Sequence, residues 1–214
     1  MVKKTKGSAN VSFDVTLNDE QKAAKDLILS TPYSFIIGNA GSGKSLLSTY
    51  IALSELFKRN FDRIVITRPT VGTEDNGFLP GTLEEKMEPW LIPIRSNMRK
   101  VYNHKEKLEA LENDGKIEIM SLQHFRGNTF DNAVVIVDEY SNMTKSQLRM
   151  AVGRLGKNSI MIFTGDYQQI DLKNKSDSAI HDLELLKDCK HVSIIKLEEN
   201  HRHPALSAVL NLLK

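Results

Sequence analysis

A glycine-rich stretch early in the chain has the residue types and spacing that hold phosphates. The residues "GNAGSGKS" (38–45) follow an apolar run and precede a helical pattern, which is the context that the spacing G-x-x-x-x-G-K-[ST] requires. Backbone N–H groups of Gly41, Gly43 and Lys44 would then face phosphates at a helix N-terminus. We expect Lys44 to contact the β- and γ-phosphate oxygens and Ser45 to bind Mg²⁺. The alternative is a glycine-rich turn with a surface lysine.

Two adjacent acids end a second apolar run, "AVVIVDEY" (133–140). Asp138 is placed to hold Mg²⁺ through water, and Glu139 to orient and polarise an attacking water. Taken alone, such a pair is usually a solvated strand end, but the phosphate-loop motif upstream favours the catalytic interpretation. An acid in the second position favours hydrolysis over transfer to a bound acceptor.

A third apolar run, "IFTGDYQQID" (162–171), stops at an acid followed by two glutamines. An ordinary loop start would explain these residues. In an open α/β sheet, however, ligands bind beyond the carboxyl ends of the strands, so Asp166 and Gln169 should face the same crevice as Lys44 and Asp138. A glutamine there can bond the γ-phosphate or the lytic water and register the loss of either.

The elements that must position these residues alternate along the chain. Short runs rich in Ile and Val predict strands at 33–38, 63–67, 116–121, 133–138, 159–165 and 191–197. Helical patterns occupy 17–30, 43–58, 144–156 and 178–188, the first with Asn18 and Gln21 in the spacing of a capping box. This order predicts an α/β fold with a mainly parallel sheet flanked by helices. The segment 68–115, rich in Gly and Pro at its start, resembles an insertion over the sheet edge.

Composition limits the other possibilities. A chain of 214 residues with 40% hydrophobic residues fits one domain, which we place at 17–214 after a mobile polar tail at 1–16. The formal charge of +2 favours no polyanionic partner overall, so a nucleic-acid site must be a local patch. Cys189 is the only cysteine and forms no internal disulfide, and no apolar run reaches the roughly 18 residues of a membrane span. We expect a soluble, cytoplasmic protein without a membrane partner.

Six short motifs, in this order, resemble the motor motifs of superfamily 1 helicases: "LNDEQ", "GNAGSGKS", "TRPT", "VDEYSN", "GDYQQID" and "EENHRHP". The run "TRPTVGTEDNGFLPGTLEEKMEPWLIPI" (67–94) is more closely similar to the signature of the PhoH-like ATPases, and the similarity extends over nearly the whole chain from Leu17. The resemblance implies a single RecA-like P-loop NTPase domain that uses ATP and Mg²⁺ and acts in RNA or DNA metabolism. Such domains also occur in phages, where the location would be the host cytoplasm.

The resemblance also implies roles for individual residues. Gln21 would contact the adenine edge, Gln169 would sense the γ-phosphate, and Arg202 would contact the γ-phosphate. The expected nucleotide-binding residues are Gln21, Gly38, Asn39, Ala40, Gly41, Ser42, Gly43, Lys44 and Ser45; the catalytic residues are Lys44, Glu139, Gln169 and Arg202; the Mg²⁺ residues are Ser45 and Asp138. Tyr140 and Ser141 replace the alanine and glutamine of an expected "DEAQN", so the glutamine that couples the acids to the sensor is absent. Tyr167 replaces the proline of "GDPxQID".

Nucleic-acid contacts are predicted at one strand end. Thr67, Arg68 and Thr70 occupy the position that resembles a single-strand contact in related motors. Arg95, Arg99 and Lys100 form a basic face on a predicted helix, which would extend these contacts into a basic track. An ordinary solvated helix surface explains the same residues equally well. We interpret Trp90 as a packing anchor, and His201 and His203 as structural residues or phosphate neighbours. Zinc is not expected, because no CxxC motif is present.

The leading hypothesis is a Mg²⁺-dependent ATPase whose cycle is coupled to RNA or single-stranded DNA. Two alternatives stay open: a small-molecule or nucleotide kinase, which the spacing G-D-x-x-Q disfavours, and a nucleotide-controlled binding switch with slow turnover. Arg202 would act either on its own site or on the ATP of a neighbouring subunit, and the second route favours a homo-oligomer such as a hexameric ring. Unwinding is not implied, because helicases of this superfamily use two motor domains.

Overall fold

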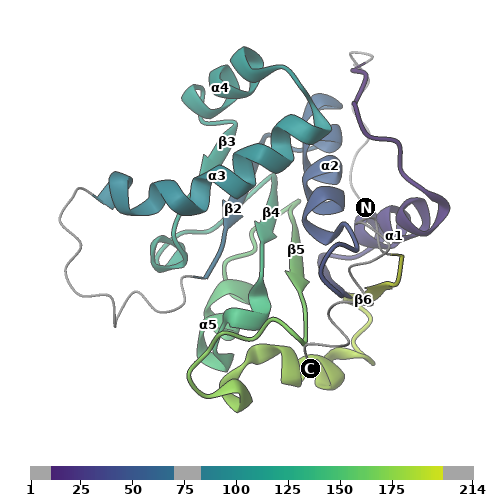
Figure 1. The fold of residues 1–214 in the computed structure, drawn as a ribbon, viewed down its shortest axis with the longest axis vertical. Coiled ribbons are helices and arrows are strands. Elements are labelled where there is room, and N and C mark those ends of the chain that lie inside the picture. The colour runs from purple at the N-terminus through teal and green to yellow at the C-terminus, as the bar shows by residue number, and fades with distance from the viewer. Residues whose placement is uncertain (1–10, 70–82, 200–214) are drawn as a thin grey trace, which may run out of the picture.

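Six parallel strands form one sheet in the part of the chain that the structure describes. The computed structural model describes residues 11–69 and 83–199, the side chains of 83–90 excepted. The strand order is β3-β2-β4-β5-β1-β6 (Figure 1). The strands are β1 Tyr33–Gly38, β2 Arg63–Thr67, β3 Ile117–Ile119, β4 Ala133–Val137, β5 Ile160–Gly165 and β6 Val192–Leu197. The predicted α/β fold with a mainly parallel sheet is confirmed.

The apolar character of the strands follows from burial on both faces. Every residue of β4, "AVVIV", is buried, as expected for a central strand of a parallel sheet that helices cover on each side. Val137 at the end of β4 pairs with Thr67 of β2 and with Phe163 of β5. The carboxyl ends of three neighbouring strands therefore lie side by side, and the loops that follow them emerge together.

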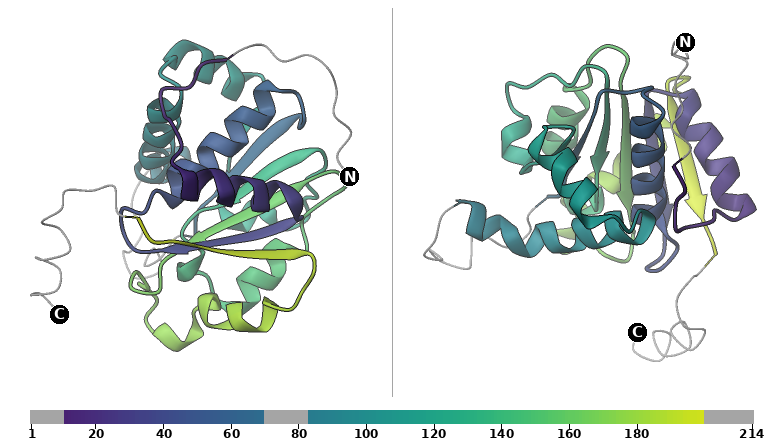
Figure 2. Two further views of the ribbon diagram at one scale, coloured as in Figure 1. Left: turned by 90° about the vertical axis from the view of Figure 1, so that its right-hand side faces the viewer. Right: turned by 90° about the horizontal axis from the view of Figure 1, so that it is seen from above.

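Within the described residues, one face of the sheet is covered by the α-helices α1 Asp19–Ser30, α2 Lys44–Phe57, α3 Leu83–Val101 and α4 Lys105–Asn113. Ile28, Leu47, Met98 and Leu108, one from each helix, join the hydrophobic cluster that contains the sheet residue Ile64. The opposite face packs against α5 Lys145–Val152 and short 3₁₀ segments (Figure 2). The segments that contribute to this packing are η1 Leu122–Phe125, η2 Tyr140–Asn142 and η4 Ala179–Leu186. A further segment, η3 Lys175–Asp177, has no buried residue.

The predicted capping box sets the start of α1. The side chain of Asn18 accepts a hydrogen bond from the backbone N–H of Gln21 at 2.7 Å, and Gln21 Oε1 accepts one from the Asn18 N–H at 3.2 Å. Two N–H groups that a helix start would otherwise leave unpaired are thereby satisfied. The helix begins at Asp19, two residues later than the pattern suggested.

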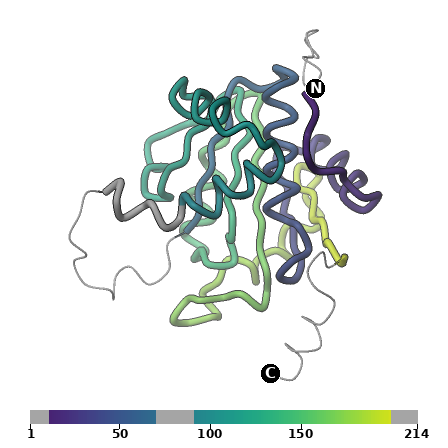
Figure 3. Tube along the Cα trace, turned by 45° about the horizontal axis from the view of Figure 1, so that its top comes forward, coloured from purple at the N-terminus to yellow at the C-terminus, as the bar shows by residue number. Residues whose placement is uncertain are grey.

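Three expectations need correction. Residues 11–16, assigned to a mobile tail, pack on the core: the Phe13 ring lies 5.0 Å from that of Tyr50, and Asp14 N–H bonds Val101 O at 2.9 Å. The helical pattern at 178–188 forms 3₁₀ turns rather than an α-helix. The described part of 68–115 is not confined to the sheet edge, because α3 lies against α2 (Figure 3). No helix of the described ranges has the length and apolarity needed to cross a membrane.

Candidate nucleotide-binding and catalytic site

The predicted phosphate loop joins β1 to α2. Gly41 and Gly43 have φ values of 90° and 83°, a left-handed conformation that costs glycine little. Gly43 is the N-cap of α2 and makes no side-chain cap, so the first turn of the helix presents its backbone N–H groups toward the loop. Lys44 Nζ donates to the carbonyl oxygens of Gly38 at 2.6 Å and Asn39 at 3.0 Å, so its ammonium group lies over the loop. This arrangement suits an anion bound at the helix N-terminus.

A cavity of about 310 Å³ opens beside this loop. Its lining includes Lys44, Ser45, Glu139, Thr164, Asp166 and Gln169. These residues come from the ends of β4 and β5 as well as from the phosphate loop. The three motifs that the sequence singled out separately therefore meet at one cavity.

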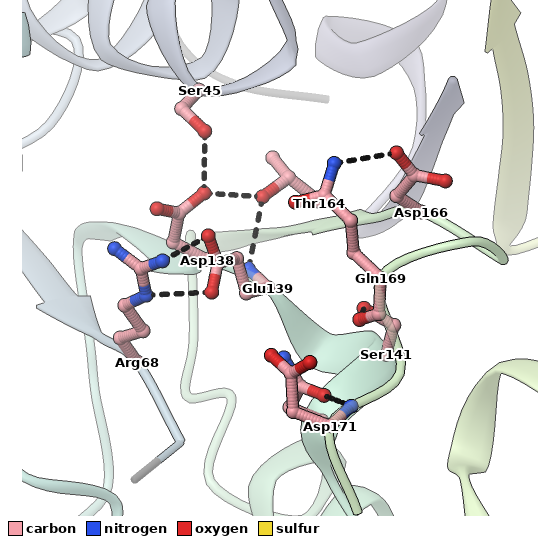
Figure 4. Close-up of polar contacts among 10 residues, drawn as sticks. Ser45, Arg68, Asp138, Glu139, Ser141, Thr164, Asp166, Gln169 and Asp171 are labelled. Carbon is pink, nitrogen blue, oxygen red and sulfur yellow. Dashed lines mark hydrogen bonds and ion pairs between the residues drawn. The ribbon is translucent and has the colours of Figure 1, made fainter. Parts of the chain in front are cut away.

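Asp138 lies at the centre of the polar contacts (Figure 4). It is 7% exposed, and its Oδ1 accepts hydrogen bonds from Ser45 Oγ at 2.6 Å and from Thr164 Oγ1 at 2.5 Å. A carboxylate and a hydroxyl are hard oxygen donors of the kind that Mg²⁺ prefers. Ser45 and Asp138 therefore fit the predicted Mg²⁺ site.

Thr164 is a functional candidate that the sequence analysis missed. Its hydroxyl donates to Asp138 and also accepts the backbone N–H of Glu139 at 3.2 Å, so one buried side chain joins both acids. The one signal in the sequence is a polar residue that ends the apolar run "IMIF" immediately before Gly165.

Glu139 forms an ion pair that the sequence did not predict. Arg68 Nε donates to Glu139 Oε2 at 2.8 Å, and Arg68 Nη2 contacts Glu139 Oε1 (Figure 4). Burial lowers the pKa of Arg68, but the hydrogen bond and charge of Glu139, with the charges of Asp138 and Asp171, outweigh burial and raise that pKa above its usual value. Arg68 is thus a permanently charged cation beside the candidate catalytic acid.

Direct hydrogen bonds join the loops that follow β4 and β5. Ser141 Oγ donates to the carbonyl oxygen of Gln169 at 3.2 Å, and Asn142 Oδ1 accepts the N–H of Asp171 at 2.8 Å. Gln169 Nε2 in turn donates to Asp166 Oδ2 at 2.8 Å. The loop of the acids and the loop of the candidate sensor are therefore in contact, although the glutamine expected at position 141 is a serine.

Tyr140 fills the space beneath these loops. Its ring is fully buried and packs edge-on against Phe35 and Phe163, with ring centroids 5.3 and 5.7 Å away. A Cβ at Gly165 would lie 2.6 Å from Cε1 of this ring, so the packing requires glycine there. The Tyr140 hydroxyl has no hydrogen-bond partner in the described residues, and burial raises its pKa far above the usual value.

Comparison with known proteins assigns the family. The sequence profile described as "PhoH-like protein" matches residues 15–214. The chain belongs to the PhoH-like family. A PhoH-like protein of Synechocystis sp. is 40% identical over 181 residues, which cover 83% of this chain and 55% of that protein. Protein PhoH of Escherichia coli K12 is 35% identical over 192 residues, 88% of this chain and 54% of the relative. The chain thus spans about half the length of these two relatives.

The fold of this PhoH-like chain also occurs among solved structures. The large terminase of a thermophilic bacteriophage matches with a TM-score of 0.51 at 11% identity, over 85% of this chain and 46% of the terminase. At that identity the likeness shows the fold alone. Together with the family match, it identifies the chain as a P-loop NTPase.

Three other predicted residues, all within the described ranges, do not have the predicted role in the structure. Gln21 is 4% exposed, bonded within the capping box, and not among the described residues that line the cavity. Thr67 is fully buried at the end of β2 and offers no surface to a nucleic acid. Arg95 pairs with Glu112 at 2.8 Å, so it does not extend a free basic track. Outside the described residues or side chains lie Thr70, Trp90, His201, Arg202 and His203.

Two polar residues of α3 reach the cavity unexpectedly. Asn97 and Lys100, one helical turn apart, line it together with the phosphate loop. Lys100 was expected on a nucleic-acid track. The packing of α3 against α2 accounts for the difference, because it brings the polar side of α3 to the candidate nucleotide site.

Proposed function

We propose that this chain hydrolyses ATP with Mg²⁺ and that RNA or single-stranded DNA controls its turnover. The observation that carries the proposal is a cavity lined by Lys44, Ser45, Glu139 and Gln169. Asp138 is joined to this lining by its hydrogen bond from Ser45. Arrays of this composition bind a triphosphate and position a water for attack on the γ-phosphate.

Each side chain has a part that its environment supports. The N–H groups of the α2 N-terminus and Lys44 bind the phosphates, and Ser45 and Asp138 would hold Mg²⁺, which would supply positive charge to neutralise the phosphates. Glu139 orients the lytic water and accepts its proton. Gln169, held by Asp166 and Ser141, contacts the γ-phosphate or the water and reports its loss to the loop after β4.

The nucleic-acid partner is proposed for the edge where β2 ends. Arg68 leaves this strand beside Glu139, so a phosphodiester bound there would lie next to the candidate catalytic acid. We also propose that Arg202 completes the site of a neighbouring subunit in a homo-oligomeric ring, as sequence similarity to motor proteins suggested. A cytoplasmic location remains part of this proposal.

ATPase measurements test the proposal. Wild type should release phosphate from ATP only with Mg²⁺, and faster with single-stranded RNA or DNA. Lys44→Ala should abolish hydrolysis and weaken ATP binding, whereas Glu139→Gln should keep ATP binding and lose turnover, because the amide retains the shape without the base. Loss of ATP binding together with turnover in Glu139→Gln would assign Glu139 a structural role. Hydrolysis by Lys44→Ala at the wild-type rate would overturn the site assignment.

One observation favours a second candidate, a nucleotide-controlled binding switch with slow turnover. Arg68 contacts both carboxylate oxygens of Glu139, so these oxygens are occupied by the guanidinium rather than available to a water. A switch would bind ATP tightly and hydrolyse it slowly even with nucleic acid present. The ratio of stimulated to unstimulated rates separates the two candidates.

A further inference from the structure

The ion pair between Arg68 and Glu139 connects two sites. Glu139 lines the cavity beside the phosphate loop, whereas Arg68 is not among the described residues that line it and lies at the end of β2. Two guanidinium nitrogens contact the two carboxylate oxygens, an arrangement that fixes both charge and orientation. One movement of Arg68 would therefore change the state of the carboxylate in the cavity.

The backbone of Glu139 cannot easily provide that change. Its φ of 56° and ψ of 43° are left-handed, which is uncommon for a residue with a side chain. The N–H of Glu139 is held by the Thr164 hydroxyl, and the N–H of Asp138 by the carbonyl oxygen of Thr67 at 2.9 Å. These hydrogen bonds hold the backbone to β2 through Thr67 and to β5 through Thr164. The side-chain ion pair is therefore the adjustable part of this site.

The pair is also accessible to an anion. The side chain of Arg68 is 22% exposed and that of Glu139 is 34% exposed, so solvent reaches both. A planar guanidinium binds the oxygens of a phosphodiester as readily as those of a carboxylate. Asp138 and Asp171 also attract Arg68, so an arriving phosphate competes with three carboxylates rather than with Glu139 alone.

We infer that Arg68 is a positioning residue that restrains Glu139 until a nucleic-acid phosphate takes its guanidinium. This inference rests on the proposed ATPase function. In the paired state, Arg68 neutralises Glu139 and occupies the oxygens that would accept the proton of the lytic water. In the released state, the carboxylate remains in the cavity with its oxygens available to water. Nucleic acid thereby stimulates hydrolysis without touching the nucleotide.

The test replaces Arg68 by glutamine and compares basal and stimulated ATPase rates. Arg68→Gln should raise the rate without nucleic acid by about fivefold or more, the low end of ordinary coupling between sites. A single-stranded oligonucleotide should stimulate the variant little further. The matched control is Arg63→Gln, because Arg63 lies on the same strand and pairs with Glu118 at 2.8 Å at the end away from the cavity. Arg63→Gln should keep the wild-type basal rate and stimulation.

A second variant shows whether the gain passes through Glu139. The double variant Arg68→Gln/Glu139→Gln should lose the raised rate, and Arg68→Lys, which keeps the charge without the planar fork, should fall between wild type and Arg68→Gln. A basal rate of Arg68→Gln at or below wild type, or undiminished stimulation, would overturn the inference. If wild type hydrolyses ATP and Glu139→Gln does not, that result leaves the proposed function intact. Absence of Mg²⁺-dependent hydrolysis in wild type, with or without oligonucleotide, would instead overturn the proposed function.

Discussion

Replacing Thr164 by valine tests the geometry of the candidate Mg²⁺ site. Valine keeps the shape of threonine but removes the hydroxyl that donates to Asp138 at 2.5 Å and accepts the Glu139 N–H at 3.2 Å. In the structure Asp138 also accepts a hydrogen bond from the Ser45 hydroxyl, but we expect this hydroxyl to turn toward Mg²⁺ when the ion binds. Of the two hydroxyls, that of Thr164 would then be the one that still donates to Asp138.

The size of the effect follows from the charge on Asp138. A hydrogen bond to a charged group contributes about 1.5–3 kcal/mol, and a buried N–H left unpaired costs about 1–3 kcal/mol more. If only the contribution of the hydrogen bond to Asp138 is lost from Mg²⁺ binding, the affinity for Mg²⁺ falls by about 10- to 150-fold. The Mg²⁺ concentration that gives half the maximal ATPase rate should rise by an amount in this range.

The assay is the ATPase rate across a Mg²⁺ titration at fixed ATP, with unfolding curves to confirm that the variant is folded. Thr164→Ser is the matched control, because serine keeps the hydroxyl and loses only a methyl group. It should titrate close to wild type. A wild-type Mg²⁺ dependence in Thr164→Val would refute the reasoning. Equal impairment of both variants would assign the effect to packing of the methyl group.

Three further predictions concern packing and charge. Tyr140→Phe removes a buried hydroxyl without a partner in the described residues and should raise the free energy of unfolding by about 1 kcal/mol in urea denaturation; a loss of stability would show that the hydroxyl is satisfied. Gly165→Ala should lower the same quantity by about 1–3 kcal/mol, because its Cβ meets the Tyr140 ring; an unchanged midpoint would contradict this. Lys100→Gln should weaken ATP binding in calorimetry by up to about fivefold, since an exposed charge contributes up to about 1 kcal/mol. Arg99→Gln should leave the affinity for ATP unchanged, because Arg99 is not among the described residues that line the cavity. Equal ATP affinities in the two variants would argue against a role for Lys100.

The fold was predictable because burial on both faces imposes a simple pattern. The runs at 33–38 and 63–67 coincide with β1 and β2, and the run at 133–138 exceeds β4 by its final residue, Asp138. An apolar strand that ends at a polar residue marks its own carboxyl end. In a parallel sheet those ends share one edge, so the convergence of Lys44, Asp138 and Asp166 also followed from the sequence.

Contacts between neighbouring strands were not predictable, because the sequence does not state which strands are adjacent. Arg68 and Glu139 are 71 positions apart, and they meet because β2 lies beside β4. The position of Lys100 depends on how α3 packs against α2. A helical pattern in the sequence shows which side of a helix is apolar, but it does not show in which direction the helix crosses the sheet. Sequence similarity suggested a nucleic-acid role for Arg68, and a basic helical face suggested one for Lys100. In the structure Lys100 lines the candidate nucleotide site, and Arg68 contacts Glu139, which also lines it.

The register of the strands determines which of these residues can act together. Because Thr67 pairs with Val137, and Val137 with Phe163, the next residues along the three strands are Arg68, Asp138 and Thr164. A slip of one residue in β5 would turn the side chain of Thr164 to the other face and separate it from Asp138. The same slip would move Phe163 out of the cluster that it forms with Phe35 and Tyr140. Apolar packing in the core thus fixes the register, and the register brings the hydroxyl of Thr164 within hydrogen-bond distance of both Asp138 and the backbone of Glu139.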